Sequence, residues 1–291
     1  MNKMNLKNGE TIAYEDKGSG EKVLIAIHGN MSSSKHLDVL FENFPENLRI
    51  IVPDLRGFGE SSYNEKVNSL EEYANDIIEL IDALKIDKFS LLGWSTGGGI
   101  AMEIASIENE RVQKLILIAS VGTTGYPMAK LSELGQPIEN EILKTREDVE
   151  GDTFRTIAIQ KAFDENNRDF VKATWEAVIY THNKPTPEKY EEYVSDVLTQ
   201  KSIADVYYSL LSFNISNKHN GVKEGNNKIS TIKADTLIIQ GERDYVVPME
   251  MALSIKEGLG EKAKLVTGDF GHSPFVDCPS FICETVIDFF K

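Results

Sequence analysis

The stretch Gly93-Trp94-Ser95-Thr96-Gly97 decides the fold, because it joins an apolar run to a helical pattern. Phe89-Ser90-Leu91-Leu92 precedes it, and residues 98–105 have the spacing of a packed helix. A chain that turns sharply from strand to helix is strained at the turn residue, and the two elements nearly touch on either side. Glycines at 93 and 97 meet that steric demand. The stretch therefore predicts a serine hydroxyl held at the carboxyl end of a sheet.

Strands and helices alternate on both sides of this turn. Unbroken apolar runs are typical of strands buried on both faces, as in parallel sheets. Residues 3–18 instead indicate a hairpin turning at Asn8-Gly9. Further strands are predicted at 23–27, 49–52, 115–119, 236–240 and 263–266, and helices at 34–43, 70–84, 96–108, 248–259 and 279–290. The alternation predicts a mostly parallel sheet with helices on both faces.

Residues 122–233 interrupt this alternation, because they contain no comparable apolar strand. A gap of that length inside a sheet indicates an insertion with its own helices. Helices are predicted at 140–148, 152–163, 167–181, 187–199 and 202–213. We therefore expect a core of residues 1–121 and 234–291 and a helical cap of residues 122–233.

Composition excludes several classes of function. The chain has 291 residues, 41% of them hydrophobic, and a net charge of −15. Such acidity argues against binding to nucleic acid or to anionic membranes. The N-terminal residues have no apolar signal region, and no stretch is apolar enough to span a bilayer, so we expect a cytoplasmic protein. Cys278 and Cys283 are not expected to pair, and no Cys/His cluster indicates a metal site.

A serine nucleophile needs a base, and the base needs an orienting acid. His272 follows the last predicted strand, and Asp244 follows the strand before it. Loops after the carboxyl ends of parallel strands meet at one rim, so Ser95, Asp244 and His272 are the predicted triad. Glu242 and Asp269 remain alternatives to Asp244.

The attacked carbonyl oxygen becomes an anion that needs N–H donors. The backbone N–H of Thr96 is one predicted donor, and the loop after residues 23–27 supplies the other. Asn30 is preferred there, with Met31 as the alternative. His28 is interpreted as a structural histidine of this loop.

These segments resemble the α/β-hydrolase superfamily. The resemblance rests on His28-Gly29-Asn30, on residues 54–61 and 93–99, and on Gly241–Pro248 and Gly271-His272-Ser273. It implies an α/β-hydrolase fold, a helical lid over a pocket, and hydrolysis of small acyl compounds without a cofactor. Ser95 argues against the branches that place an aspartate at this position.

The predicted function is hydrolysis of a small-molecule ester or lactone. A carbon–carbon hydrolase of ring-fission diketones, a cofactor-free perhydrolase and a non-catalytic binding protein are the alternatives. Met31 and Trp94 beside the serine, and Trp175 and His182 in the insertion, are candidate substrate-binding residues. Tyr180 and Met128 are further candidates, and plain packing is the alternative for each of the insertion residues. For Trp94, packing beneath the serine is the alternative to lining the acyl site.

Overall fold

The computed structural model describes residues 1–45 and 47–290, which contain an eight-stranded sheet in the order β1-β2-β4-β3-β5-β6-β9-β10. Neighbouring strands from β4 to β10 are parallel, whereas β2 is antiparallel to both of its neighbours. The strands are β1 (Asn2–Asn5), β2 (Thr11–Lys17), β3 (Lys22–Ile27), β4 (Leu48–Pro53), β5 (Phe89–Trp94), β6 (Val112–Ile118), β9 (Asp235–Gly241) and β10 (Ala263–Gly268).

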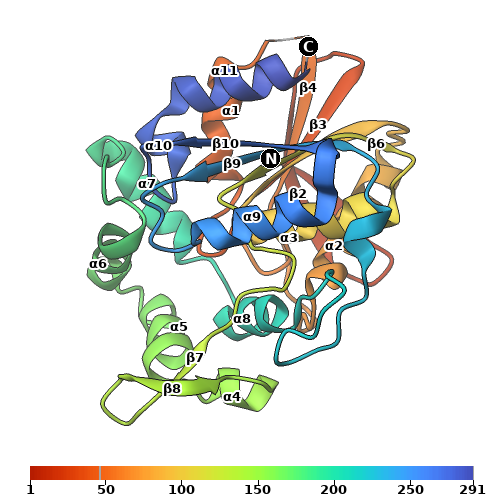
Figure 1. Cartoon of the computed structure of the whole chain (residues 1–291). Coiled ribbons are helices and arrows are strands. Elements are labelled where there is room, and N and C mark those ends of the chain that lie inside the picture. Colours follow the sequence, from red (N-terminus) through yellow and green to blue (C-terminus); the bar gives the residue numbers. More distant parts are fainter. Residues whose placement is uncertain (46, 291) are drawn as a thin grey trace.

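Helices cover both faces of this sheet (Figure 1). Side chains of a strand point alternately to its two faces. Ile25 and Ile27 therefore pack with α2 and α3, while Leu24 and Ala26 pack with α1 and α11. The core helices are α1 (Asp38–Asn43), α2 (Leu70–Ala83), α3 (Thr96–Ile107), α9 (Met249–Leu259), α10 (Pro274–Asp277) and α11 (Pro279–Phe290). The predicted layered α/β fold is confirmed.

The insertion is helical with one exception near its start. Its helices are α4 (Arg146–Glu150), a π-helical turn (Thr153–Ile157), α5 (Ala158–Asp164), α6 (Arg168–Val178), α7 (Pro187–Val197) and α8 (Ile203–Ser212). The predicted helix at 140–148 is wrong, because β7 (Ala129–Leu131) and β8 (Pro137–Ile142) form a hairpin there. Gly135, at a φ of 73°, closes its turn, and Thr145 caps α4 so that this helix begins only at Arg146.

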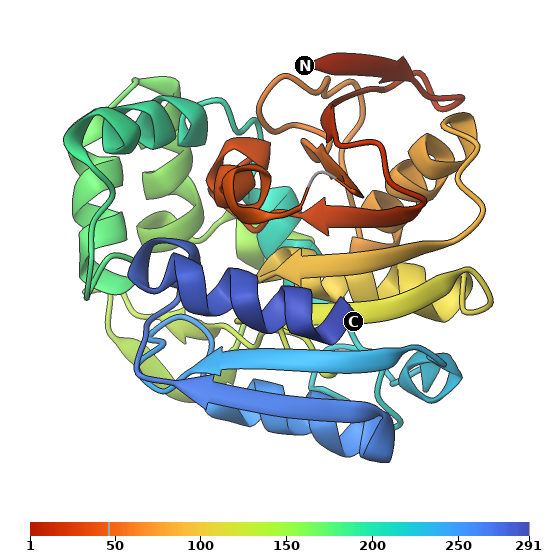
Figure 2. The same cartoon turned by 90° about the horizontal axis from the view of Figure 1, so that it is seen from above.

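The insertion lies at the carboxyl ends of the parallel strands. In Figure 2 the arrowheads of β9 and β10 point toward the side of the molecule where its green helices lie. Val206 and Leu211 of α8 share one apolar cluster with Leu70 of α2, so this end of the insertion is packed onto the core. The division into a core and a separate cap stays a prediction.

The described part of the chain has no helix with both the length and the apolar character that crossing a bilayer requires.

Candidate active site

Ser95 lies at a sharp turn between β5 and α3. Its φ of 56° and ψ of −119° lie outside the conformations that non-glycine residues ordinarily adopt. A Cβ on Gly97 would lie 2.3 Å from the carbonyl oxygen of Ile27, and one on Gly93 would lie 2.3 Å from that of Gly97. Any larger residue would separate strand from helix. The glycines thus allow the close approach that holds Ser95 in its strained conformation.

The structure brings the side chains of Ser95, His272 and Asp244 together. His272, in the loop after β10, has Nε2 3.1 Å from Ser95 Oγ. Its Nδ1 lies 2.9 Å from Oδ2 and 3.1 Å from Oδ1 of Asp244, which follows β9. The alternative acids point elsewhere, since Glu242 accepts from Thr267 and Asp269 pairs with Arg243.

Asp244 is held as an ionised acceptor. Its Oδ1 accepts the backbone N–H groups of Val246 and Val247, both at 2.8 Å, and its Oδ2 accepts from Gln240 Nε2. Burial by itself raises the pKa of Asp244, but His272 and the two N–H donors outweigh it and leave the pKa lowered. A carboxylate accepts only, so the His272 proton belongs on Nδ1 and Nε2 is free to accept from Ser95.

Trp94 contacts both the backbone and the ring of His272. Its indole N–H donates to the carbonyl oxygen of His272 at 2.9 Å, and the two rings lie 5.7 Å apart. The indole is almost wholly buried, yet it also lines the cavity described below. Trp94 therefore combines the two roles that the sequence left as alternatives.

The loop after β3 passes directly beside the serine. A Cβ on Gly29 would lie 3.0 Å from Ser95 Cβ and 3.5 Å from Ser95 Oγ. Among the described residues, none accepts the backbone N–H of Asn30 or of Thr96, and both residues line the cavity. The N–H of Met31 instead donates to Gln200 Oε1 at 2.9 Å. This arrangement favours Asn30 over Met31 as the second oxyanion donor.

His28 is fully buried and holds the same loop. Its Nε2 accepts the N–H of Leu55 at 3.0 Å, and its Nδ1 donates to the carbonyl oxygen of Gly29 at 2.8 Å. Burial lowers the pKa of His28 to about 4. The imidazole is therefore neutral and fully used in binding backbone, as a structural histidine should be.

Stability should depend on pH through His28. The unfolded chain binds the proton at the ordinary histidine pKa of 6.5, whereas burial lowers the pKa of His28 in the folded chain to about 4, so stability falls as pH drops through this window. His28→Gln keeps an acceptor for Leu55 but does not titrate. The difference in unfolding free energy between wild type and variant should shrink by about 2–3 kcal/mol from pH 7.5 to 4.5. Urea unfolding across this range measures it, and parallel pH curves would contradict it.

Asp54 and Arg56 stabilise the loops at the carboxyl ends of the strands without lining the cavity. Asp54 accepts the N–H groups of Ser34 and Glu60, both at 2.9 Å, and Arg56 makes two bonds to Asp76, at 2.8 and 2.7 Å. Neither side chain is among those that line the cavity. They fix the backbone on which the loop beside Ser95 rests.

A cavity of about 270 Å³ lies over Ser95 and His272 between the core and the insertion. Of the candidate substrate-binding residues, Met31, Trp94, Trp175 and Met128 line it, whereas His182 and Tyr180 do not. Tyr180 packs on Trp175 and Tyr190, and His182 Nδ1 lies 3.1 Å from Thr181 Oγ1. The wall also includes residues that sequence reasoning missed, namely Val121, Tyr126, Arg155, Ile159, Thr174, Val178, Ile179, Tyr207, Leu210, Val246 and Val247.

Some of these omissions had a signal in the sequence. Val246 and Val247 follow Asp244 in the same loop, so they could have been placed at the rim. Arg155 and Tyr207 depend on how the π-helical turn and α8 pack, which no motif indicates. No group of three His, Cys, Asp or Glu side chains in the described residues is arranged to hold a metal ion.

The strand order and the strained serine turn define a class of protein, and comparison with known proteins agrees. Residues 22–279 match the family described as alpha/beta hydrolase fold. The chain belongs to the α/β-hydrolase family, and this membership supports a hydrolase.

Two relatives and one solved structure illustrate the range of activities named among proteins similar to this chain. The bifunctional esterase/perhydrolase DCH of Acinetobacter calcoaceticus is 25% identical over 278 residues, covering 92% of this chain and 91% of that protein. The 2-hydroxy-6-oxononadienedioate/2-hydroxy-6-oxononatrienedioate hydrolase 1 of Pseudomonas putida is 23% identical over 271 residues, covering 90% and 85%. The esterase EaEST of Exiguobacterium antarcticum has the same fold, with a TM-score of 0.73, 24% identity and coverage of 99% and 98%.

Proposed function

We propose that this protein is a serine hydrolase that cleaves carboxylic esters or lactones of small molecules through an acyl-enzyme. One observation carries the proposal: Ser95, His272 and Asp244 form a continuous hydrogen-bonded chain, and Ser95 and His272 line a cavity. A hydroxyl bonded to a neutral imidazole, itself bonded to a carboxylate, is the arrangement that activates serine.

In the first half of the proposed reaction, Ser95 Oγ attacks the carbonyl carbon while His272 Nε2 takes the hydroxyl proton. The carbonyl oxygen becomes an anion that accepts hydrogen bonds from the N–H groups of Asn30 and Thr96. Collapse of this intermediate breaks the bond to the alcohol oxygen, which receives the proton from His272. The acyl group is then an ester of Ser95.

In the second half, His272 takes a proton from water as the water oxygen attacks the acyl carbon. The second intermediate collapses to the carboxylic acid, and His272 returns the proton to Ser95 Oγ. Asp244 stays ionised and stabilises the imidazolium that forms in each half. These steps use groups of the chain and water, with no cofactor.

The cavity wall favours a small neutral substrate. Most lining side chains are apolar, and the guanidinium of Arg155 is paired with Asp152, with Nε 2.8 Å from Oδ2. A negatively charged substituent on the substrate would therefore find no unpaired cation among the described residues that line the cavity. A volume of about 270 Å³ is just below the range of typical ligand pockets, which is about 300–1,000 Å³.

A series of p-nitrophenyl esters with increasing acyl length, together with lactones, tests this function. We expect kcat/KM to be highest for chains of about two to six carbons and to fall at least about tenfold by twelve, because long chains exceed the cavity. A fluorophosphonate probe should label the wild type at Ser95. Absence of both turnover and labelling would leave the chain as a non-catalytic binding protein.

Perhydrolysis is the second candidate, because it uses the same acyl-enzyme with hydrogen peroxide in place of water. The similarity to the esterase/perhydrolase DCH favours including it. Peracid formation from a carboxylic acid and peroxide, measured beside ester turnover, separates the two reactions. A vinylogous diketone in the same panel tests carbon–carbon cleavage, which the Pseudomonas putida relative suggests.

A further inference from the structure

Gln200, just after α7 of the insertion, is bonded to the loop that supplies the oxyanion donor. Its Oε1 accepts the N–H of Met31 at 2.9 Å, and its Nε2 donates to Asn30 Oδ1 at 2.8 Å and to the carbonyl oxygen of Ser202 at 3.3 Å. The side chain is 3% exposed. One acceptor and both amide hydrogens are thus used away from bulk water, and the link spans about 170 residues of sequence.

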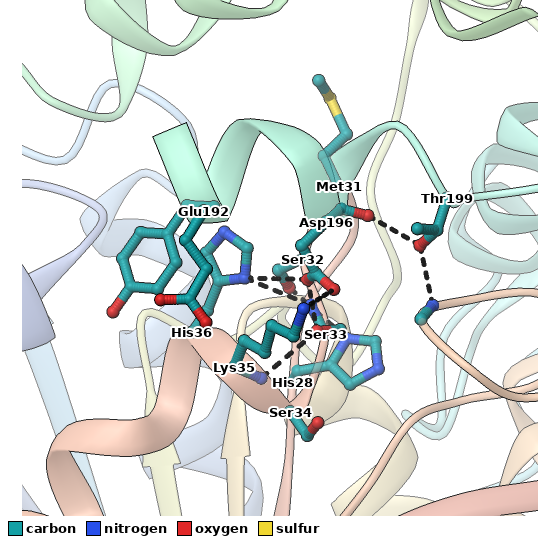
Figure 3. A network of polar contacts seen from close by, with 12 residues as sticks. His28, Met31, Ser32, Ser33, Ser34, Lys35, His36, Glu192, Asp196 and Thr199 are labelled. Carbon is teal, nitrogen blue, oxygen red and sulfur yellow. Dashed lines mark hydrogen bonds and ion pairs between the residues drawn. The ribbon is translucent and has the colours of Figure 1, made fainter. Parts of the chain in front are cut away.

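A second contact joins α7 to the same loop (Figure 3). Asp196 is buried, and it accepts from the hydroxyl of Ser33, lies 3.4 Å from His36 Nδ1 and lies 3.8 Å from Lys35 Nζ. Burial raises the pKa of Asp196, but His36, Ser33 and Lys35 outweigh it, and the pKa is lowered. An ionised side chain of α7 is therefore held by the core at this point.

Thr199 makes the third contact, with a different core loop. Its Oγ1 accepts the N–H of Gly59 at 2.9 Å and donates to the carbonyl oxygen of Asp196. Gly59 follows Asp54 in the loop after β4. In the described residues it makes no hydrogen bond with Asn30 or Met31. Thr199 thus attaches the insertion to the core without touching the oxyanion loop.

The backbone beside Asn30 needs such support. Met31 has a φ of 54°, in the left-handed region that non-glycine residues rarely adopt. Such a conformation is strained and persists only where its surroundings hold it. The bond from Met31 N–H to Gln200 fixes the peptide plane between Asn30 and Met31, and the bond to Asn30 Oδ1 fixes the side chain. Together they limit rotation of Asn30 and so the direction of its own N–H.

We propose that Gln200 is a positioning residue that aims the Asn30 N–H at the oxyanion, so that the insertion helps to build the oxyanion hole. The proposal rests on the serine-hydrolase function proposed above. Gln200 does not touch the reacting atoms. It acts through Asn30 and Met31, and its loss should weaken stabilisation of the transition state more than binding of the ground state.

Gln200→Met tests the proposal, because methionine has a similar shape and lacks the amide. We expect kcat to fall by about 10–100-fold, with KM changed by less than about threefold. A misdirected oxyanion donor loses part of the transition-state stabilisation that removing the donor would abolish. Affinity for an aryl trifluoromethyl ketone, whose serine adduct carries the oxyanion, should fall in the same proportion.

Thr199→Val is the matched control from the same turn. It removes the bonds to Gly59 and Asp196 and leaves Gln200 in place, so it should lower the melting temperature while kcat stays within about threefold. A loss of kcat equal to that of Gln200→Met would assign the effect to general attachment of the insertion and overturn the proposal.

Hydrogen exchange of the peptide containing Asn30 and Met31 gives a readout that needs no turnover. Gln200→Met should lose protection there, and Thr199→Val should not.

Asn30→Ala removes the other partner of the hydrogen bond between Gln200 and Asn30, so its effect on kcat should be non-additive with that of Gln200→Met. If Gln200→Met does not fold, Asn30→Ala takes its place in the kinetic test. If the wild type is active and Gln200→Met has the same kcat as the wild type, the positioning role of Gln200 is wrong and the proposed function stands. A wild type without turnover or probe labelling defeats the proposed function, and with it the role of Gln200 in catalysis.

Discussion

Ser95→Ala is expected to lower kcat for ester hydrolysis by about 10⁴–10⁶-fold, which corresponds to about 5–8 kcal/mol of activation free energy. Alanine has no oxygen to form the acyl-enzyme, and His272 Nε2 loses its partner at 3.1 Å. KM should change little, because the cavity walls remain. The fold should also remain, since alanine at a φ of 56° is no more strained than serine.

Ser120→Ala is the matched control for this loss. Ser120 is a buried serine just after β6, and its hydroxyl donates to the carbonyl oxygen of Val121 at 2.9 Å. Its removal should lower stability by about 0.5–1.5 kcal/mol and leave kcat within about threefold. A Ser95→Ala variant that retains a tenth of wild-type kcat would refute the assignment of the nucleophile.

The sequence predicts the core well because the core depends on local rules. Strands buried on both faces must be continuously apolar, and the sharp turn at Ser95 requires glycines at 93 and 97. The hairpin of β7 and β8 has no comparable signal in the sequence, because β7 has three partly exposed residues and most residues of β8 are exposed. Their pairing depends on the turn at Gly135, and no apolar alternation marks the two strands against the helix expected at 140–148.

The candidate triad could be located from the sequence because its members follow the ends of parallel strands, which meet at one rim. The cavity wall could not be located in the same way. Trp175 lines the cavity and His182, seven residues later, does not, because α6 ends between them. Gln200 carries no motif at all. Its contact with Asn30 arises from how α7 docks on the core, which sequence spacing does not determine.

Asp244→Asn should lower kcat by about 10⁴-fold at neutral pH while leaving the site almost unchanged in shape. The N–H groups of Val246 and Val247 require an acceptor, so the asparagine carbonyl should take the place of Oδ1. The amide nitrogen then faces His272 Nδ1. Two donors cannot share that contact, so His272 must move its proton to Nε2 and can no longer accept from Ser95.

Asp269→Asn separates this tautomer effect from a general loss of negative charge at the rim. Asp269 lies after β10 and pairs with Arg243 at the surface, where an ion pair contributes little to stability. Its replacement should leave kcat within about twofold. Labelling by a fluorophosphonate should slow in Asp244→Asn in proportion to kcat, because both reactions require a deprotonated Ser95. If Asp269→Asn caused the larger loss instead, the acid would have to be reassigned, and the short contacts between Asp244 and His272 would be structural.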